Sequence, residues 1–545
     1  MLRRLVLLLA LAAASLGGFD YATRITPPDL PPPHVEAVKS DAAALRVGPA
    51  YLSRRGALWV MQVRGAPEEI GYRHARLATP LMAEGDRRML DLFSDRVPSS
   101  VFRWAITRIV EARYRNLDSG FPISRRAEIY GETSGYDDPF AYFLPTYQRL
   151  VYLHGLYDIA LAFEQSPLIG CTAFVASGDA TRDGSTPRHT IVGRNFDLDI
   201  DRWFDEEKLV DVVEPNDGIA FASVAWPGMT GVVTGMNAAG IWVSVNGGRA
   251  SSPHTGGVPV VFTTRAVLEH ARSLDDALRI IEHDEPMASH ILLVADGKTG
   301  ESMVVERAPG RAPGVVRDPS SMVVANHFRT SPLKDDPKDA RVRDTTSTEM
   351  RQARTEELVR ENYGKIDPPL ALAMLRDYAA PGGASLPIGH HGAIDALVAT
   401  HSVVADLTAH VLWVSEGPHT LGRFRRIELD ERIASGDGAA TSEAEGDLDE
   451  GTRLRDGSLE LHRLGNRQRK AAEAFASRGR FDTAADVYRH AIAIRADDHL
   501  AWRELALVLE RRGDDADARA AWRRVLELGP ESPAAKREAE IHAGR

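Results

Sequence analysis

Cysteine is almost absent from this chain of 545 residues, which contains a single one, Cys171. One thiol cannot form a disulfide within the chain, so no internal cross-link supports the fold. The side chain is therefore either an inert, buried apolar group or a chemically reactive one.

Hydrophobic runs long enough to cross a bilayer are also absent. The apolar run Leu5–Leu16 follows a start that contains Arg3 and Arg4, and it is shorter than the roughly 20 residues of a membrane-spanning helix. This pattern predicts a secretion signal over residues 1–18 and an exported protein, periplasmic or secreted. A weak membrane tether through a retained N-terminus is the alternative.

An excess of basic residues is missing as well. The sequence has 66 lysines and arginines against 77 aspartates and glutamates, for a formal net charge of -11. Nucleic-acid binding requires a concentrated basic face, so this balance argues against nucleic acid as a partner. With 43% apolar and 26% charged residues, the composition is typical of a globular protein with a large core and several folding units.

Several common catalytic and cofactor motifs do not occur. There is no Gly-x-Ser-x-Gly nucleophile elbow, and Gly297–Thr299 lacks the upstream glycine of a phosphate-binding loop. No recognised metal-ligand spacing appears among the histidine groups His390–His391 with His401 and His283 with His290. We therefore expect neither a cofactor nor a metal.

The surroundings of Cys171 predict a β-hairpin. Alternating residues indicate a strand over 171–175, and a second apolar run covers 190–197 after a turn-rich segment. Pairing of the two strands would bring Arg194 and Asp197 close to Cys171. A guanidinium group near a thiol favours the nucleophilic thiolate. The alternative is a small buried cysteine beside a surface ion pair.

The hydrophobic pattern divides the chain into a helical and a sheet-rich part. A strand at 57–63 and a helix at 68–84 precede a mostly helical stretch over 86–165. After Cys171, short apolar runs separated by Gly, Asn, Asp and Pro predict an antiparallel sheet. Two amphipathic helices, 263–271 and 274–282, interrupt it.

Short fragments along the chain resemble one enzyme group in the same order: 63–74, 170–172, 193–197, 235–246, 291–296, 323–328 and 347–351. The chain resembles the N-terminal nucleophile (Ntn) hydrolases of the choloylglycine hydrolase and penicillin acylase group. It is most similar to the branch that contains acyl-coenzyme A:6-aminopenicillanate acyltransferase. The resemblance covers roughly residues 55 to 425.

This resemblance implies an α+β fold, a four-layer α-β-β-α sandwich with a helical prosegment. The predicted division is a signal peptide at 1–18, a Pro-rich spacer at 19–46, the helical prosegment at 47–170, the catalytic domain at 171–430, an acidic linker at 431–465 and a C-terminal α-helical repeat domain at 466–545.

A cut between Gly170 and Cys171 would give one residue both a thiol and a free α-amine. Their reference pKa values, about 8.5 and about 7.7 to 8.0, allow proton exchange near neutral pH without a separate histidine base. Before the cut, the same thiol could attack the carbonyl of Gly170, which has no side chain to obstruct it.

The resemblance also assigns roles to other residues. It places Arg194 and Asp197 beside the thiol and the new amine, lets Asn246 and Asn326 donate or organise hydrogen bonds at the tetrahedral centre, and lets Arg351 complete the polar network. Loss of one oxyanion donor typically costs about 3 kcal/mol. As structural alternatives, Asn246 is a turn residue, Asn326 a strand-end cap, and Arg351 a charge on the surface of a helix.

The C-terminal part contains an internal repeat. Ala472, Gly479, Ala484 and Tyr488 recur about 34 residues later as Ala506, Gly513, Ala518 and Trp522. The period and the pattern of small and aromatic residues resemble tetratricopeptide repeats. Two units are fewer than the usual three, so a helix over 459–470 or the catalytic domain is expected to cap them. A structural spacer and a site for a protein partner are both open.

We therefore predict a self-cleaving cysteine amidohydrolase or acyltransferase that acts on a small linear amide through an acyl-thioester on Cys171. Hydrolysis is preferred because an exported enzyme meets water more readily than acyl-coenzyme A. The alternatives are an uncleaved thiol hydrolase, a lipid-ester hydrolase of the same fold, and a non-catalytic scaffold whose repeats bind a partner.

Overall fold

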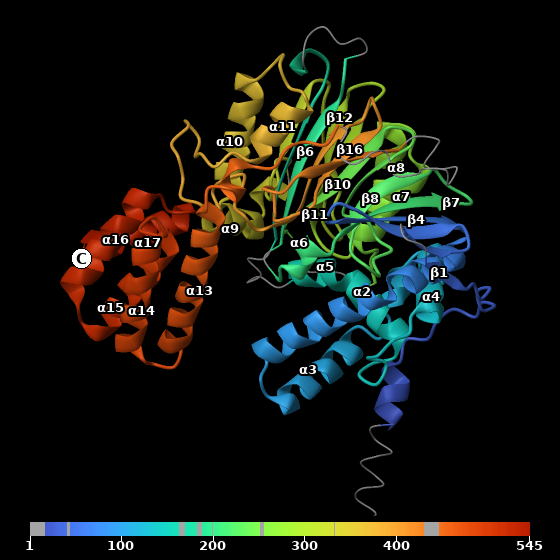
Figure 1. The fold of residues 1–545 in the computed structure, drawn as a ribbon, viewed down its shortest axis with the longest axis horizontal. Helices are drawn as coiled ribbons and strands as arrows, with labels where there is room; N and C mark the ends of the chain where they lie inside the picture. Colours follow the sequence, from blue (N-terminus) through green and yellow to red (C-terminus); the bar gives the residue numbers. More distant parts are fainter. Residues whose placement is uncertain are drawn as a thin grey trace, which may run out of the picture.

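The computed structural model describes residues 17–40, 44–162, 169–181, 188–198, 200–250, 256–331, 333–429 and 446–544 (Figure 1). Nearly all of the predicted signal peptide and most of the non-helical part of the predicted linker lie outside these residues. Within them, no helix combines the length and the apolar composition that crossing a bilayer requires.

Two β-sheets form the centre of the molecule. The larger has eleven described strands in the order β1-β2-β3-β4-β7-β8-β9-β10-β11-β12-β13. Their bounds are β1 Val38–Ser40, β2 Ala44–Val47, β3 Ala50–Arg55, β4 Leu58–Gly65, β7 Leu209–Pro215, β8 Phe221–Ala225, β9 Thr234–Asn237, β10 Ile241–Gly247, β11 His290–Asp296, β12 Ser302–Arg307 and β13 Gly314–Asp318.

The smaller sheet has six described strands in the order β14-β5-β6-β15-β16-β17. Their bounds are β5 Ile169–Ala176, β6 Ile191–Leu198, β14 Ser321–Val324, β15 Ala399–Asp406, β16 Val411–Ser415 and β17 Phe424–Glu428. From residue 67 to residue 375, the α-helices that pack around the two sheets to form the sheet unit are α2 Pro67–Arg96, α3 Ser100–Arg113, α4 Ile123–Gly135, α5 Thr146–Ala162, α6 Trp203–Glu206, α7 Val260–His270, α8 Leu274–His283, α9 Pro337–Thr345, α10 Thr348–Glu361 and α11 Pro368–Leu375.

The alternation of side chains along β5 shows how the sheets are packed. Ala173 and Val175 belong to an apolar core that joins both sheets, whereas Phe174 and Ala176 belong to a core shared with α10 and α11. Successive side chains of a strand point to opposite faces, so both faces of this sheet are buried. A third core joins the larger sheet to α2, α7 and α8.

Several sequence-based boundaries are wrong. The strand predicted at 171–175 begins at Ile169, so Cys171 lies inside it. The strand predicted at 57–63 is present as β4, but β1, β2 and β3 form within the predicted spacer and the start of the predicted helical prosegment. Strand β4 pairs in parallel with β7, in a sheet predicted to be antiparallel. Hydrogen bonds to a distant strand stabilise β4 in this position, and local patterns carry no information about such pairing.

The mostly helical stretch predicted over 86–165 is largely confirmed. The sequence patterns did not predict α4 as a separate helix. Helix α4 packs closely on α2 because glycines face each other. A Cβ on Gly71 would lie 1.9 Å from the carbonyl oxygen of Glu128, and one on Gly131 would lie 2.0 Å from that of Glu68. Any larger side chain at either position would separate the two helices.

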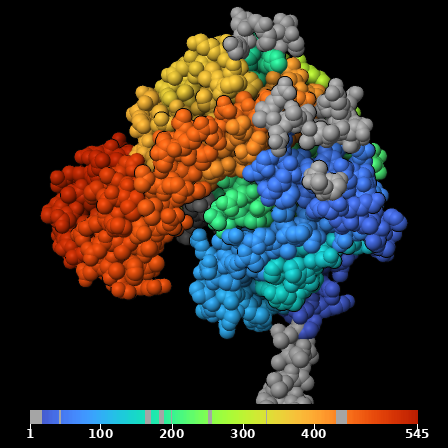
Figure 2. Space-filling model, viewed as in Figure 1, coloured from blue at the N-terminus to red at the C-terminus, as the bar shows by residue number. Residues whose placement is uncertain are grey.

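The C-terminal helical unit consists of α13 Ser458–Ala476, α14 Phe481–Ile494, α15 His499–Arg512, α16 Asp515–Leu528 and α17 Pro533–Gly544. Its repeated aromatic positions, Tyr488 and Trp522, are both fully buried. The expected capping helix over 459–470 is present as part of α13, which begins inside the predicted linker. Figure 2 shows the unit as a lobe beside the sheet unit.

Candidate active site

The predicted hairpin around Cys171 is present. Strands β5 and β6 pair in an antiparallel register that sets Cys171 opposite Phe196 and Gly170 opposite Asp197. Two positions before Phe196, on the same face of β6, Arg194 places its Nη2 atom 3.9 Å from the sulfur of Cys171. The hairpin therefore brings the thiol and a guanidinium group together, as the sequence predicted.

Strand β10 of the larger sheet fixes the position of Arg194. The Nη1 group of Arg194 donates to Oδ1 of Asn246 at 3.2 Å, and its Nη2 group donates to the carbonyl oxygen of Val245. Asn246 in turn donates through Nδ2 to the carbonyl oxygen of Ala325 at 2.8 Å. Asn246 thus holds the guanidinium group against the thiol and links β10 to the end of β14.

Asn326 lies just beyond β14 and contacts the backbone of the nucleophile. Its Oδ1 accepts hydrogen bonds from the backbone N–H of Cys171 and from Nη2 of Arg351, each at 2.8 Å. Its Nδ2 donates to the carbonyl oxygen of Gly247 at 3.2 Å. The nitrogen that a cut would turn into an α-amine is therefore already held by a side-chain oxygen.

Arg351 reaches the same point from helix α10. Its Nη1 group donates to the carbonyl oxygen of Cys171 at 2.5 Å and to Oγ1 of Thr172 at 2.7 Å. The side chain is buried, so the structure excludes the alternative of a surface charge on this helix. The sequence had also left two roles open for Asn246 and Asn326. In this structure the amide nitrogens of both residues donate to backbone carbonyl oxygens, so these side chains hold the surrounding strands and the Arg194 and Arg351 side chains in position.

Burial dominates the electrostatics of this group. It raises the pKa of the Cys171 thiol, while the nearby positive charge of Arg194 opposes that shift. Burial also raises the pKa of Asp197 to about 6 against the opposing effect of Arg351, and it lowers the pKa of both arginines. Burial therefore favours the protonated form of the thiol.

Both arginines are charged groups in an enclosed site. Among the described residues, no carboxylate lies within ion-pair distance, 4.0 Å, of either Arg194 or Arg351, and each is nearly or fully buried. Neutral oxygen atoms accept their hydrogen bonds instead. Burying an excess of positive charge destabilises the folded state. The same charge stabilises any negative charge that forms on the thiol or on a bound carbonyl group.

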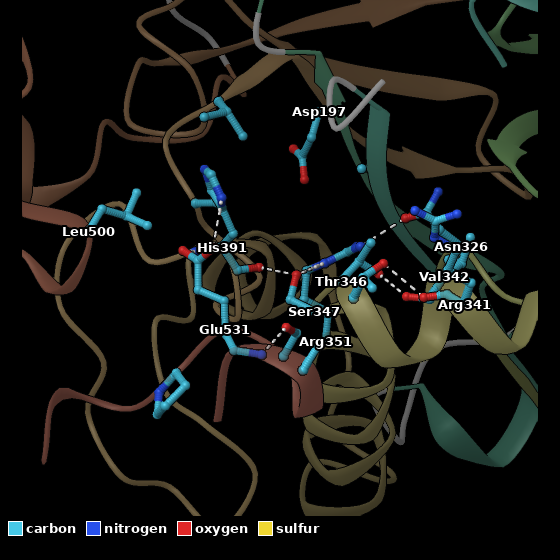
Figure 3. Close-up of a pocket in the computed structure, with 18 of the residues that line it drawn as sticks. Asp197, Asn326, Arg341, Val342, Thr346, Ser347, Arg351, His391, Leu500 and Glu531 are labelled. Atoms are coloured by element: carbon cyan, nitrogen blue, oxygen red, sulfur yellow. Dashed lines mark hydrogen bonds and ion pairs between the residues drawn. The ribbon is translucent and has the colours of Figure 1, made fainter. Parts of the chain in front are cut away.

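A cavity of about 740 Å³ reaches this group from outside. Gly170, Asp197, Asn326 and Arg351 are among its lining residues, together with residues of α9 and of the C-terminal helical unit (Figure 3). Its volume is in the range of small-molecule sites. Cys171 itself is fully buried and does not line the cavity.

Residues 183–381 match the family model of the acyl-coenzyme A:6-aminopenicillanic acid acyl-transferases. The matched segment contains Arg194, Asp197, Asn246, Asn326 and Arg351, and it begins after Cys171. This is the enzyme family that the sequence fragments resembled. The match does not extend to the C-terminal helical unit.

Other similarities are more distant. An uncharacterized protein from Archaeoglobus fulgidus is 25% identical over 463 residues, which are 76% of this chain and 70% of that protein. The Caenorhabditis elegans ortholog of N-acylethanolamine-hydrolyzing acid amidase is 18% identical with a TM-score of 0.32, over 44% of this chain and 93% of that one. A mutant conjugated bile acid hydrolase from Clostridium perfringens is 11% identical with a TM-score of 0.32, over 51% of this chain and 98% of that one.

Tyr157, on α5, is a neighbour of the thiol that sequence reasoning did not assign. Its side chain is half-buried, and its ring stacks on Phe196 with 6.2 Å between the ring centroids. Burial and the adjacent Cys171 raise the pKa of its hydroxyl group far above the usual value. The hydroxyl is a neutral group beside the sulfur, and a helical pattern alone gives no sign of this proximity.

The histidines considered as metal ligands do not come together as a set. His401 lies apart from His390, with its ring stacked on Phe196 at 4.9 Å between centroids. A different group, His390, His499 and Glu531, has potential ligand atoms within 4.8 Å of one another. However, Nε2 of His390 bonds the carbonyl oxygen of Gly529 and its Nδ1 accepts from the N–H of Gly392. Both ring nitrogens of His390 are thus occupied by backbone groups, which disfavours metal binding there.

Proposed function

We propose that this protein is a self-cleaving cysteine amidohydrolase that transfers the acyl group of a linear amide to Cys171 and then to water. One observation supports this most directly: the thiol lies beside a guanidinium group that is buried without a carboxylate partner. A protein that used Cys171 only for packing would gain nothing from that buried charge. The match to an acyl-transferase family over the segment that carries Arg194 supports the same chemistry.

The self-cleavage that we propose needs no group beyond this cluster and water. The sulfur of Cys171 attacks the carbonyl carbon of Gly170, the C–N bond breaks, and the released nitrogen takes up the thiol proton as an amine. Water then hydrolyses the thioester, which frees the thiol and leaves a carboxylate on Gly170. The positive charges of Arg194 and Arg351 lower the energy of the negatively charged intermediates.

The contacts of Asn326 and Asp197 suit the α-amine that the cut would create. Oδ1 of Asn326 already accepts from that nitrogen at 2.8 Å. The strand register puts Asp197 directly opposite Gly170, and a Cβ on Gly170 would lie 3.5 Å from an oxygen of the Asp197 carboxyl group. The amine would then be the base that accepts the thiol proton during turnover, and Asp197 would stabilise the ammonium form.

Turnover of an external amide repeats the first reaction. The substrate acyl group takes the place of Gly170, the thiol attacks its carbonyl carbon, and the leaving amine takes a proton from the α-ammonium group of Cys171. Water completes the cycle. We prefer water to an amine as the final acceptor because we also propose export of the protein.

The architecture of the two units is part of the proposal as well. We propose that the two sheets and their covering helices are the four-layer sandwich of Ntn hydrolases. The C-terminal helical unit is proposed to be tetratricopeptide-like, since consecutive helices bury the repeated positions Tyr488 and Trp522.

The intact mass of the purified protein tests the proposal. We expect two chains, and N-terminal sequencing should show that the second begins at Cys171. A single uncut chain that nevertheless hydrolyses amides would contradict self-cleavage and support an uncleaved thiol hydrolase. Added hydroxylamine should divert the acyl group to a hydroxamic acid if an acyl-thioester forms, and its failure to do so during active turnover would contradict the thioester.

A further inference from the structure

The cavity that reaches Gly170 has one wall outside the sheet unit. Leu500 on α15, Val525 on α16, and Ala534 and Ala535 on α17 line it, although they lie far beyond the segment that matches the acyl-transferase family. Figure 3 shows Leu500 and Glu531 of the C-terminal helical unit around the same cavity as Asn326 and Val342 of the sheet unit.

This wall is held in place by polar contacts between the two units. The carboxylate of Glu531 lies 3.3 Å from Nδ1 of His391, and Nε2 of His390 lies 2.6 Å from the carbonyl oxygen of Gly529. Arg537 on α17 binds Asp344 on α9 at 2.6 Å. His391 and Glu531 also line the cavity, so one of these contacts between the two units lies at the cavity itself.

The charged side chains of this wall are paired with one another, and most of its other lining residues are apolar. Arg503 binds Glu538 through two hydrogen bonds of 2.9 and 3.0 Å, and Glu531 binds His499 at 2.8 Å as well as His391. Among the apolar lining residues, Val525 is almost fully buried and Leu500 is half-buried. Such a surface fits an apolar group better than a charged one.

The position of the cavity identifies which half of an amide it would hold. The proposed reaction makes Gly170 the acyl part of the first substrate, since its carbonyl carbon is the one attacked. The cavity is lined by Gly170 and not by Cys171 or Thr172, so it extends from the acyl side of the scissile bond.

We propose that the C-terminal helical unit is the far wall of the acyl-group site and determines how long an apolar acyl group the enzyme accepts. This inference rests on the proposed function. It assigns to the repeats a role within the enzyme itself, whereas the sequence left a spacer or a partner-binding module open. Leu500 would be the residue that contacts the end of an extended acyl group.

The test compares one substitution at two leucines of the same unit. Leu500→Trp adds bulk inside the cavity, and Leu461→Trp adds the same bulk on α13, where the side chain is 52% exposed and away from the cavity. The full-length, self-cleaved variants would be assayed with acetyl, octanoyl and tetradecanoyl p-nitroanilides. Leu500→Trp should lower the ratio of kcat/KM for the tetradecanoyl to the acetyl substrate at least about tenfold, with a rise in KM, because a pocket rejects excess volume. Leu461→Trp should not change that ratio.

An unchanged ratio in Leu500→Trp, or the same change in Leu461→Trp, would overturn the inference while leaving the proposed function intact. A wild-type preference for a glutaryl over an octanoyl anilide would also overturn it, and would point to Lys338 and Arg341 on α9 as the recognising groups. If the wild-type protein neither cuts itself nor hydrolyses any anilide, the proposed function fails. In that case the inference is still decided by the binding of tetradecanoate to the uncut chain, measured by calorimetry. Leu500→Trp should weaken this binding. Absence of binding to the wild-type protein would refute the site.

Discussion

Two buried groups of charged side chains in this protein differ in how their charge is balanced. In the paired cluster, Arg125, Glu128, Arg265 and Glu269 form four ion pairs of 2.5 to 3.5 Å, two of them between α4 and α7 and one within each helix. In the Cys171 cluster, by contrast, Arg194 and Arg351 bind neutral oxygen atoms. Two positive charges match two negative ones in the first. The second has two arginines and one carboxyl group, that of Asp197, around a thiol, so one positive charge remains unbalanced even when Asp197 is ionised.

This difference separates a structural role from a chemical one. A buried ion pair costs much to desolvate but leaves no net charge, so the paired cluster fixes the position of α4 without attracting an anion. Its neighbour Glu132 adds little charge, because burial and the adjacent Glu128 raise the pKa of Glu132 well above its usual value and favour its neutral form. The unbalanced charge of the Cys171 cluster is tolerated by the fold and is available to a reaction intermediate.

The largest effect should come from the sulfur itself. Cys171→Ala should abolish both the cut after Gly170 and all amide turnover, because no other described group near the scissile bond is a thiol. Intact mass and an anilide assay measure the two losses. Two fragments in this variant would show that an external protease makes the cut.

Removal of the unpaired charge should affect rate and not folding. Arg194→Met keeps the bulk of the side chain and should lower kcat/KM by about 10²–10³, as for loss of one stabilising donor. The free energy of unfolding should stay the same or rise, because a buried charge without a carboxylate partner disappears. Amide assays and urea denaturation report the two quantities. A marked loss of stability with normal turnover would make Arg194 a structural residue.

The same substitution in the paired cluster should have the opposite outcome. Arg265→Met leaves Glu128 and Glu269 with Arg125 as their remaining arginine and should lower the free energy of unfolding by about 3–5 kcal/mol. Protein that remains folded should retain its kcat. Urea denaturation followed by assays well below the unfolding midpoint checks both. Equal effects of Arg194→Met and Arg265→Met would erase the distinction between the two clusters.

A smaller effect concerns pH. The pKa of Asp197 is raised to about 6, so its neutral form is favoured in the folded state. This contribution to stability is complete below the unfolded value of 3.8 and is lost as the pH rises through about 6. Activity should rise over the same range, because the carboxylate stabilises the proposed α-ammonium group.

Asp197→Asn provides the control for this assignment, since it cannot ionise. Its residual activity should lack the acidic limb near pH 6 in a profile of kcat/KM against pH. A limb that persists in the variant would belong to another group, and Asp197 would then lose its proposed role.

Prediction from sequence worked best where neighbours along the chain decide the outcome. The hairpin of β5 and β6 needs one turn, so alternation and turn residues sufficed to place Arg194 near Cys171. The buried aromatic positions Tyr488 and Trp522 were likewise visible as a periodic pattern. The residues whose contacts span a long stretch of chain, Asn326 and Arg351, were assigned by resemblance to a family and by no local signal.

Sequence alone determined that the chain has one thiol, which residues alternate around it, and where the C-terminal helices repeat, since these depend on composition and on short-range periodicity. Only the tertiary structure decided that Arg194 and Arg351 are buried without carboxylate partners, that β4 joins a distant strand, and that Leu500 lies along the cavity that reaches Gly170. Charge balance and cavity shape arise from side chains that the fold brings together from distant positions, so no local pattern encodes them.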